Sequence, residues 1–175
     1  MAYILSAQLD DDAVAYGAFA RYQAYVASVR GAFPPGALAL ATSDWYFNAS
    51  DHRAPHDAWL ERVELTERER VETGGARRRV AITLRLLGAY HDGHIELRYE
   101  DVTRYRIELA AMPRDAARGH RDWRYDEFRL AAGGRVEHEI EWWGTGPTGT
   151  WLIEAADVSY AWLPFDQANL ANAAG

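Results

Sequence analysis

The chain of 175 residues contains no cysteine and no lysine. Without cysteine, neither a disulfide nor a thiolate metal site can form. The longest run without a charged residue covers 13 residues, Gly31–Ser43, and contains Pro34 and Pro35, so it is too short to cross a bilayer. Residues 1–9 lack the positive charge with which a secretory signal begins. We therefore expect a cytoplasmic protein with no membrane segment.

The composition is that of an ordinary globular protein, with 49% hydrophobic and 26% charged residues, which excludes a disordered chain. The length predicts one domain. We place it at residues 1–165 and expect residues 166–175 to form a polar tail that frays. The net charge of −7 argues against nucleic acid as a partner, because such binding needs a basic face.

An amphipathic helix is predicted near the N-terminus. Apolar residues recur there at intervals of three or four positions, which is the spacing of one helix face. They are Ala15, Phe19, Tyr22, Val26 and Val29. Asp10–Asp12 favour the start of this helix, and Gly31 with the two prolines beyond it marks the end.

Strands are predicted from residue 37 onward, because apolar and polar residues alternate there. We expect a short strand at Ala37–Thr42. The further strands are expected at residues 59–65, 80–86, 95–99, 105–109, 123–130, 136–142 and 151–162. Gly74 and Gly75 predict a hairpin connection inside the highly charged segment Glu67–Arg79. The apolar row changes phase near Asp126, which predicts a β-bulge, and again near 155–157 in the last strand.

These elements predict an α+β fold. An N-terminal amphipathic helix is followed by about seven or eight antiparallel strands, which form a curled sheet, a sandwich or a partly open barrel.

Histidines and aspartates are concentrated in two loops of the predicted sheet. The candidate ligands are His52, His56, Asp57, His91 and His94. If the loops converge, these side chains suit a divalent transition metal that activates water for hydrolysis. The structural alternative, which we favour, is that they belong to turns and hold the loops to the sheet.

His138 lies on the apolar face of its strand, either as a hydrogen-bonded core residue or as the polar group of a cavity for a small apolar ligand. Three glutamates occupy the opposite face of that strand. They are Glu137, Glu139 and Glu141. They could do acid–base chemistry; the alternative, which we favour, is a solvated face opposite arginines such as Arg104 and Arg106.

Aromatic residues make up 13% of the chain, and we assign Trp59, Trp123 and Trp162 to the core. Trp142 and Trp143 are adjacent in a strand, so they point to opposite faces and cannot share one core. A second aromatic group lies in a polar loop. The interface candidates are therefore Trp45, Tyr46, Phe47, Trp142 and Trp143, since such residues anchor protein interfaces.

The segment from Pro55 to Leu60, with the strands at Val80–Leu87 and Ile95–Val102, resembles small bacterial β-rich domains of unknown function. Some of these resemble immunity proteins of polymorphic toxin systems. The resemblance implies a soluble cytoplasmic protein that acts by binding and whose acidic surface suits a basic partner.

We therefore expect a non-enzymatic binding or accessory protein, immunity-like and without a cofactor, that acts through a protein partner or through self-association as a homodimer. The alternatives are a metal-dependent hydrolase that uses the histidine and aspartate cluster, and a carrier of a small apolar ligand.

Overall fold

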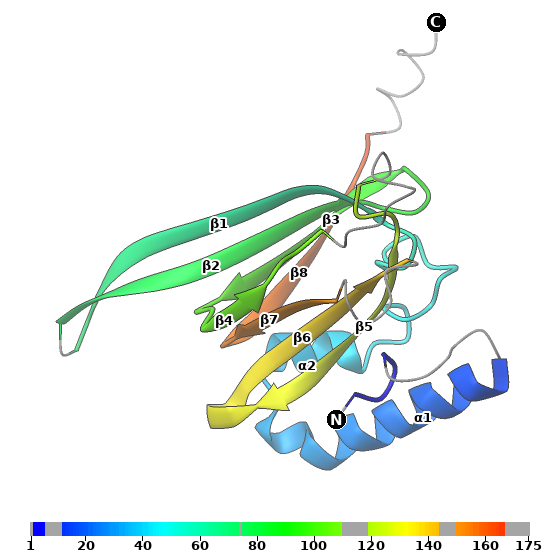
Figure 1. Ribbon diagram of the computed structural model, residues 1–175, viewed down its shortest axis with the longest axis horizontal. Coiled ribbons are helices and arrows are strands. Elements are labelled where there is room, and N and C mark those ends of the chain that lie inside the picture. Colours follow the sequence, from blue (N-terminus) through cyan, green and yellow to red (C-terminus); the bar gives the residue numbers. More distant parts are fainter. Residues whose placement is uncertain (1, 6–11, 74, 110–118, 144–149, 167–175) are drawn as a thin grey trace, which may run out of the picture.

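The computed structural model describes residues 2–5, 12–73, 75–109, 119–143 and 150–166. Within these ranges it confirms an α+β fold with eight antiparallel strands in two four-stranded sheets, neither of which closes on itself. One sheet has the strand order β1-β2-β3-β8 and the other β4-β7-β6-β5 (Figure 1). The strands are β1 (Trp59–Glu72), β2 (Gly75–Leu87), β3 (Gly93–Glu100), β4 (Arg104–Arg106), β5 (Trp123–Ala131), β6 (Arg135–Trp142), β7 (Trp151–Ala155) and β8 (Asp157–Pro164).

The predicted N-terminal helix is confirmed as α1 (Asp12–Val29), and its apolar stripe packs on the core. The buried hydroxyl of Tyr22 donates to the carbonyl of Phe128 and accepts its N–H, while the hydroxyl of Tyr25 accepts the N–H of Leu130. Because β5 is the last strand of its sheet, α1 thereby blocks the outer edge of that sheet. No helix in the described ranges is long and apolar enough to span a membrane.

The strand expected at Ala37–Thr42 is wrong, because this segment belongs to a second helix, α2 (Pro35–Ala41). Proline is favoured in the first turn of a helix, and alanine and leucine are strong helix formers. The carboxylate of Asp157, at the start of β8, accepts the N–H groups of Gly36 and Ala37 at 2.9 Å. A residue distant in sequence therefore accepts the free N–H groups of the first turn of α2.

The last predicted strand is two strands, β7 and β8, which belong to different sheets. The chain crosses between them at Ala156, whose N–H donates to the carbonyl of Glu100 at 2.8 Å. The phase change predicted near Asp126 is confirmed as a register shift between Trp123 and Tyr125. This shift turns the side chain of Asp126 into the core, where it is 3% exposed.

The core is shared by the inner faces of both sheets and by the two helices. β1 and β2 continue well beyond the other strands as a long hairpin (Figure 1). The hairpin turn predicted at the two glycines is confirmed in position, since Glu72 pairs with Gly75. We call residues 67–80 of this hairpin the arm; Gly74 lies outside the described residues.

Candidate functional site

Two loops that carry the predicted metal ligands meet at one end of the sheets. Nδ1 of His52 lies 2.5 Å from Oδ2 of Asp92, and the His52 ring stacks on Tyr90 at 3.9 Å. His94 points elsewhere, with Nε2 at 3.0 Å from Oε2 of Glu61. The structure therefore uses these two imidazoles in separate ion pairs.

The remaining candidates are also apart from one another. Nδ1 of His56 lies 3.1 Å from Oδ2 of Asp57, but the angle does not make this contact a hydrogen bond. The His91 ring packs edge-on against Trp59 at 4.6 Å. Among the described residues, no group of three or more histidine, aspartate or glutamate side chains is arranged to hold a metal ion.

His138 is fully buried and both of its ring nitrogens have partners. Nδ1 lies 2.6 Å from the hydroxyl of Tyr99, and Nε2 lies 2.8 Å from Oδ2 of Asp126. The ring stacks on Phe128 at 4.0 Å. This geometry matches the hydrogen-bonded core interpretation and leaves no ring nitrogen for a ligand.

Asp126 is the centre of this buried network. Its carboxylate also accepts the indole N–H of Trp123 at 2.9 Å and the hydroxyl of Tyr46 at 3.0 Å. Burial, followed by the nearby charge of Asp126, raises the pKa of Tyr46 and of Tyr99 well above the usual value. The network ties β3, β5, β6 and the loop after α2 together, and its role is structural.

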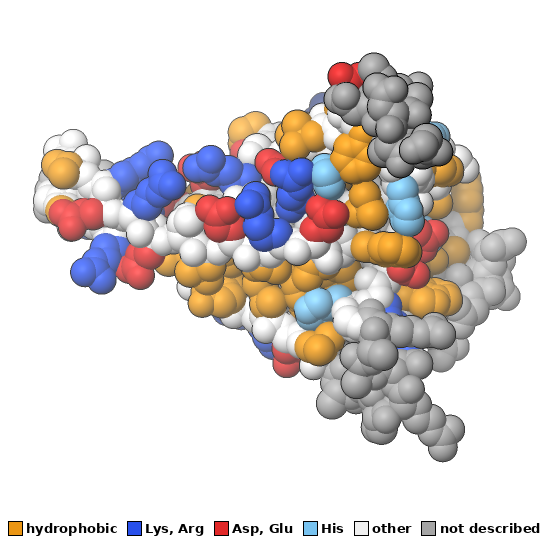
Figure 2. Space-filling model, turned by 90° about the horizontal axis from the view of Figure 1, so that it is seen from above, with side chains coloured by type: hydrophobic (Ala, Val, Ile, Leu, Met, Phe, Trp, Pro, Cys, Tyr) orange, Lys and Arg blue, Asp and Glu red, His pale blue; other side chains and the backbone are white. Residues whose placement is uncertain are grey.

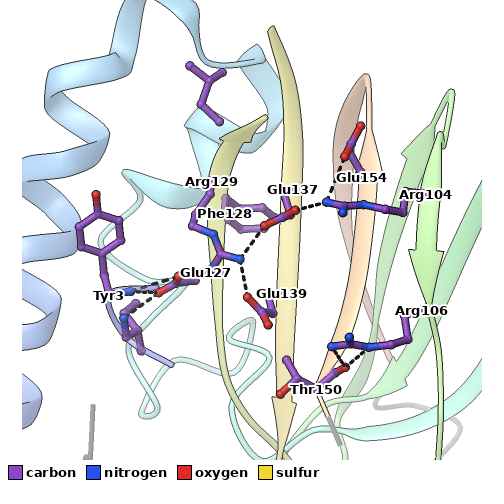
Figure 3. A network of polar contacts seen from close by, with 12 residues as sticks. Tyr3, Arg104, Arg106, Glu127, Phe128, Arg129, Glu137, Glu139, Thr150 and Glu154 are labelled. Carbon is purple, nitrogen blue, oxygen red and sulfur yellow. Dashed lines mark hydrogen bonds and ion pairs between the residues drawn. The ribbon is translucent and has the colours of Figure 1, made fainter. Parts of the chain in front are cut away.

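Arginines neutralise the glutamates on the outer face of the sheet β4-β7-β6-β5. Glu137 and Glu154 lie opposite each other on β6 and β7, and Arg104 bridges them at 2.5 and 3.3 Å (Figure 3). This confirms the arginine predicted opposite the glutamate row. Arg106 instead donates to the carbonyl of Thr150.

A second bridge of the same kind lies on β5 and β6. Glu127 and Glu139 are opposite each other, and Arg129 forms ion pairs with both. Figure 3 shows Arg129 between the glutamates. Glu127 is fully buried and also accepts the N–H groups of Tyr3 and Ile4. These carboxylates are therefore occupied by structural partners.

The predicted interface aromatics separate into three groups. Tyr46 and Trp142 are each 1% exposed, so their assignment as surface contacts is wrong: Tyr46 belongs to the Asp126 network, and Trp142 packs against neighbouring tryptophan rings. Trp45 and Phe47 are half-buried. Trp143 is 49% exposed, so the adjacent pair does point one ring inward and one outward.

Trp143 borders a cleft of about 470 Å³ at the end of the sheets. The side chains that line this cleft include those of Trp59, Leu60, His120, Arg121, Asp122 and Trp143. Its volume falls in the usual range for binding sites. We call it the tryptophan cleft.

Backbone contacts hold Trp59 and Trp143 on either side of Asp122. Trp59 forms an antiparallel bridge with Asp122, and the N–H of Trp143 donates to the carbonyl of Asp122 at 2.8 Å. The guanidinium of Arg124 lies 4.5 Å from the Trp143 ring centre and is itself held by Glu141 at 3.1 Å. The Trp143 ring is thus oriented before any partner arrives.

His120 forms part of the cleft wall and packs against buried rings, with centroids 5.4 Å from Trp142 and 4.8 Å from Trp151. Burial lowers the pKa of His120 below its usual 6.5, so the imidazole is neutral at pH 7. The wall is therefore aromatic and carries no histidine charge.

Trp59 was expected in the core, but it is 47% exposed. The register of β1 shifts between Leu60 and Arg62, at Glu61, the residue that breaks the apolar row in the sequence. The polar residue Glu61 within the apolar row indicates that Trp59 and Leu60 do not follow the same alternation as the rest of β1.

We compared the chain with protein-family models, curated proteins and solved structures, and none of the three comparisons found a match.

Proposed function

We propose that this chain is a non-enzymatic binding protein that acts through a protein partner, and that the tryptophan cleft is its principal contact. The observation that carries the proposal is that Trp59 and Trp143 line one cleft while each keeps about half of its surface exposed, 47% and 49%. Tryptophan is one of the residue types enriched among those that dominate binding energy.

The cleft suits an apolar or aromatic side chain that projects from the partner. Its rings are fixed before binding, by His91 beneath Trp59 and by Arg124 over Trp143, so little side-chain entropy is lost on association. The exposed rings continue past the cleft to His91 and to Tyr90, which is 48% exposed. Such a continuous aromatic border favours a binding site for a protein partner over an enclosed pocket for a small molecule.

A different protein suits the cleft better than a second copy, because two copies would each bring a net charge of −7 and repel each other. The resemblance to immunity proteins implies the same mode of action, binding to another protein. Against a hydrolase, the histidines that would hold a metal are already distributed among separate ion pairs and ring contacts.

Selection from a displayed library of short random peptides tests the proposal, because it does not require the partner itself. We expect the selected peptides to contain aromatic or large apolar residues and to depend on the cleft. Trp143→Ala and Trp59→Ala should each raise the dissociation constant about 30-fold, which corresponds to about 2 kcal/mol at an interface hot spot.

Tyr16→Ala is the matched control, because Tyr16 is 82% exposed on α1 and its loss should leave the dissociation constant unchanged within about twofold. The mass in solution, measured alongside, should be that of a monomer. Peptides that bind both tryptophan variants as tightly as the unaltered protein would refute the proposal, as would a dimer that dissociates on Trp143→Ala.

A further inference from the structure

The arm carries a second surface with an unusual distribution of charge. Arg68 lies opposite Arg79, and Arg70 lies opposite Arg77. Directly opposed residues on antiparallel strands share one face and lie close together, so four arginines form a cluster on one face of the arm. Like charges in this arrangement destabilise a hairpin.

The structure offers these arginines few carboxylates. Arg79 pairs with Asp101 at 2.5 Å. Arg68, Arg70 and Arg77 are exposed and form no ion pair within the part of the chain that the structure describes. On the other face of the arm the charges are complementary, since Arg78 lies opposite Glu69.

The other sheet shows how this protein treats opposed like charges elsewhere. There, two pairs of opposed glutamates are each bridged by an arginine, Arg104 or Arg129 (Figure 3). The arginine cluster has the inverse arrangement, with opposed cations and, among the described residues, no bridging carboxylate on Arg68, Arg70 or Arg77. A carboxylate supplied from outside would complete the same pattern.

Protection of the edge against aggregation explains only part of this arrangement. Charged side chains on an edge strand such as β1 do prevent unwanted pairing. Protection does not require the neighbouring strand β2 to present Arg77 and Arg79 against the arginines of β1. Glutamates at those two positions would protect the edge equally well and would stabilise the hairpin.

The backbone edge beside the cluster is also open. β1 is the first strand of its sheet and pairs with β2, and among the described residues its other edge is bridged only at Trp59. The corresponding edge of β5 is blocked by the tyrosine hydroxyls of α1. The protein thus covers one sheet edge and leaves the edge next to its arginines accessible.

We propose that the arm binds an extended acidic segment of a protein partner, which adds to the edge of β1 as a further strand. Main-chain hydrogen bonds to β1 supply part of the affinity, as in other cases of strand addition. Aspartate or glutamate at alternate positions of the segment lies on the arginine face and contacts Arg68 and Arg70. Guanidinium groups bind carboxylates through two parallel hydrogen bonds, which makes such contacts specific.

Charge favours an acidic protein segment over nucleic acid. The arm contains five arginines and three glutamates, a net charge of +2, whereas the whole chain carries −7, so the rest of the chain carries −9. A long polyanion would meet this negative remainder, whereas a short acidic segment contacts the arm alone. Figure 2 shows the blue and red side chains of the hairpin extending to the left, while the pale-blue histidines lie in the right half of the view. Trp59 begins β1, and Arg68 and Arg70 lie near the other end of that strand. The arm site is therefore independent of the tryptophan cleft.

The probe is a fluorescent synthetic peptide that alternates threonine and glutamate, measured by fluorescence anisotropy at low salt. The paired variant Arg68→Gln/Arg70→Gln should raise its dissociation constant about tenfold or more, because two charge-assisted contacts are lost. The matched control Arg78→Gln, on the opposite face of the arm, should change it less than about twofold. Circular dichroism verifies that each variant is folded.

Two further probes separate the alternatives. A threonine–glutamine peptide should bind at least about tenfold more weakly, since it lacks carboxylates. The same acidic peptide, N-methylated at those alternate residues whose N–H groups would face β1, should also bind at least about tenfold more weakly, since it lacks the main-chain donors along that edge. The proposal is overturned if the acidic peptide does not bind at about 1 mM, a bare minimum for recognition. Three other results would also overturn it. The first is an equal loss of affinity in Arg78→Gln and in the paired variant. The second is unchanged binding after N-methylation, and the third is tighter binding of a thymidine oligonucleotide than of the acidic peptide.

Discussion

The structure predicts a large loss of stability for Asp126→Ala. The Asp126 carboxylate, 3% exposed, accepts hydrogen bonds from the indole of Trp123, the hydroxyl of Tyr46 and the imidazole of His138. Alanine leaves all three buried donors without an acceptor. Each unsatisfied donor costs about 1–3 kcal/mol, so the three together cost about 3–9 kcal/mol. Because the Tyr46 hydroxyl can rotate, we expect the lower half of this range, about 3–6 kcal/mol. This is a large fraction of the usual stability of a domain, about 5–15 kcal/mol.

Urea unfolding, followed by tryptophan fluorescence and circular dichroism, measures the free energy of unfolding by linear extrapolation. Asp92→Ala is the matched control, because Asp92 also contacts a histidine, His52 at 2.5 Å, but at the surface; it should cost less than about 1 kcal/mol. Asp126→Asn should cost less than Asp126→Ala, since the amide oxygen accepts from Trp123 and its N–H₂ group can donate to Nε2 of His138 in the other tautomer. A loss below about 1 kcal/mol for Asp126→Ala would refute the reasoning.

Two other perturbations test the packing around this core. Burial raises the pKa of Tyr22, Tyr46 and Tyr99 well above the usual value in the folded protein, so just above pH 10 only the unfolded chain ionises these groups. Stability is full below that pH and should fall by at least about 4 kcal/mol per pH unit above it, about 1.4 kcal/mol for each of the three tyrosines. Unfolding midpoints that stay constant from about pH 9 to 11 would contradict this, and Tyr46→Phe should reduce the slope. Gly36→Ala would place a Cβ 2.0 Å from the carbonyl oxygen of Val158 and should cost about 2 kcal/mol or more by calorimetry. Gly31→Ala, with nothing within 4 Å of its Cβ, serves as the control and should change stability by less than about 1 kcal/mol.

Much of the fold follows from the sequence because periodicity reports which side chains are buried. The three-and-four spacing of α1 and the alternation in β2, β3 and β6 each describe a face that packs on the core. α2 was missed because an alternating Ala–Leu segment of this length fits either period, and the contact that fixes its start comes from Asp157. β7 and β8 were joined because the phase change between them does not reveal which sheet each strand enters.

The site was less accessible to sequence reasoning, since it depends on contacts between segments distant in the chain. The exposure of Trp143 follows from its adjacency to Trp142, a local rule of strand geometry. Tyr46 sits in a loop, where no period distinguishes a buried ring from an exposed one, and its burial depends on Asp126, a residue 80 positions away.

For the arm, the sequence shows which charged residues are present, but only the strand register shows which of them lie opposite each other. Glu67–Arg79 contains five arginines and three glutamates, and such a mixture of charges along the sequence is typical of a solvated hairpin with internal ion pairs. The register places Arg68 and Arg70 opposite Arg79 and Arg77, while Glu67 and Glu69 occupy the other face. A shift of the pairing by one residue could place both of these glutamates opposite arginines and stabilise the hairpin. The apolar pairing nearer the core, such as Val63 with Leu84, favours the register that forms. The arm therefore retains its opposed arginines at a cost in stability.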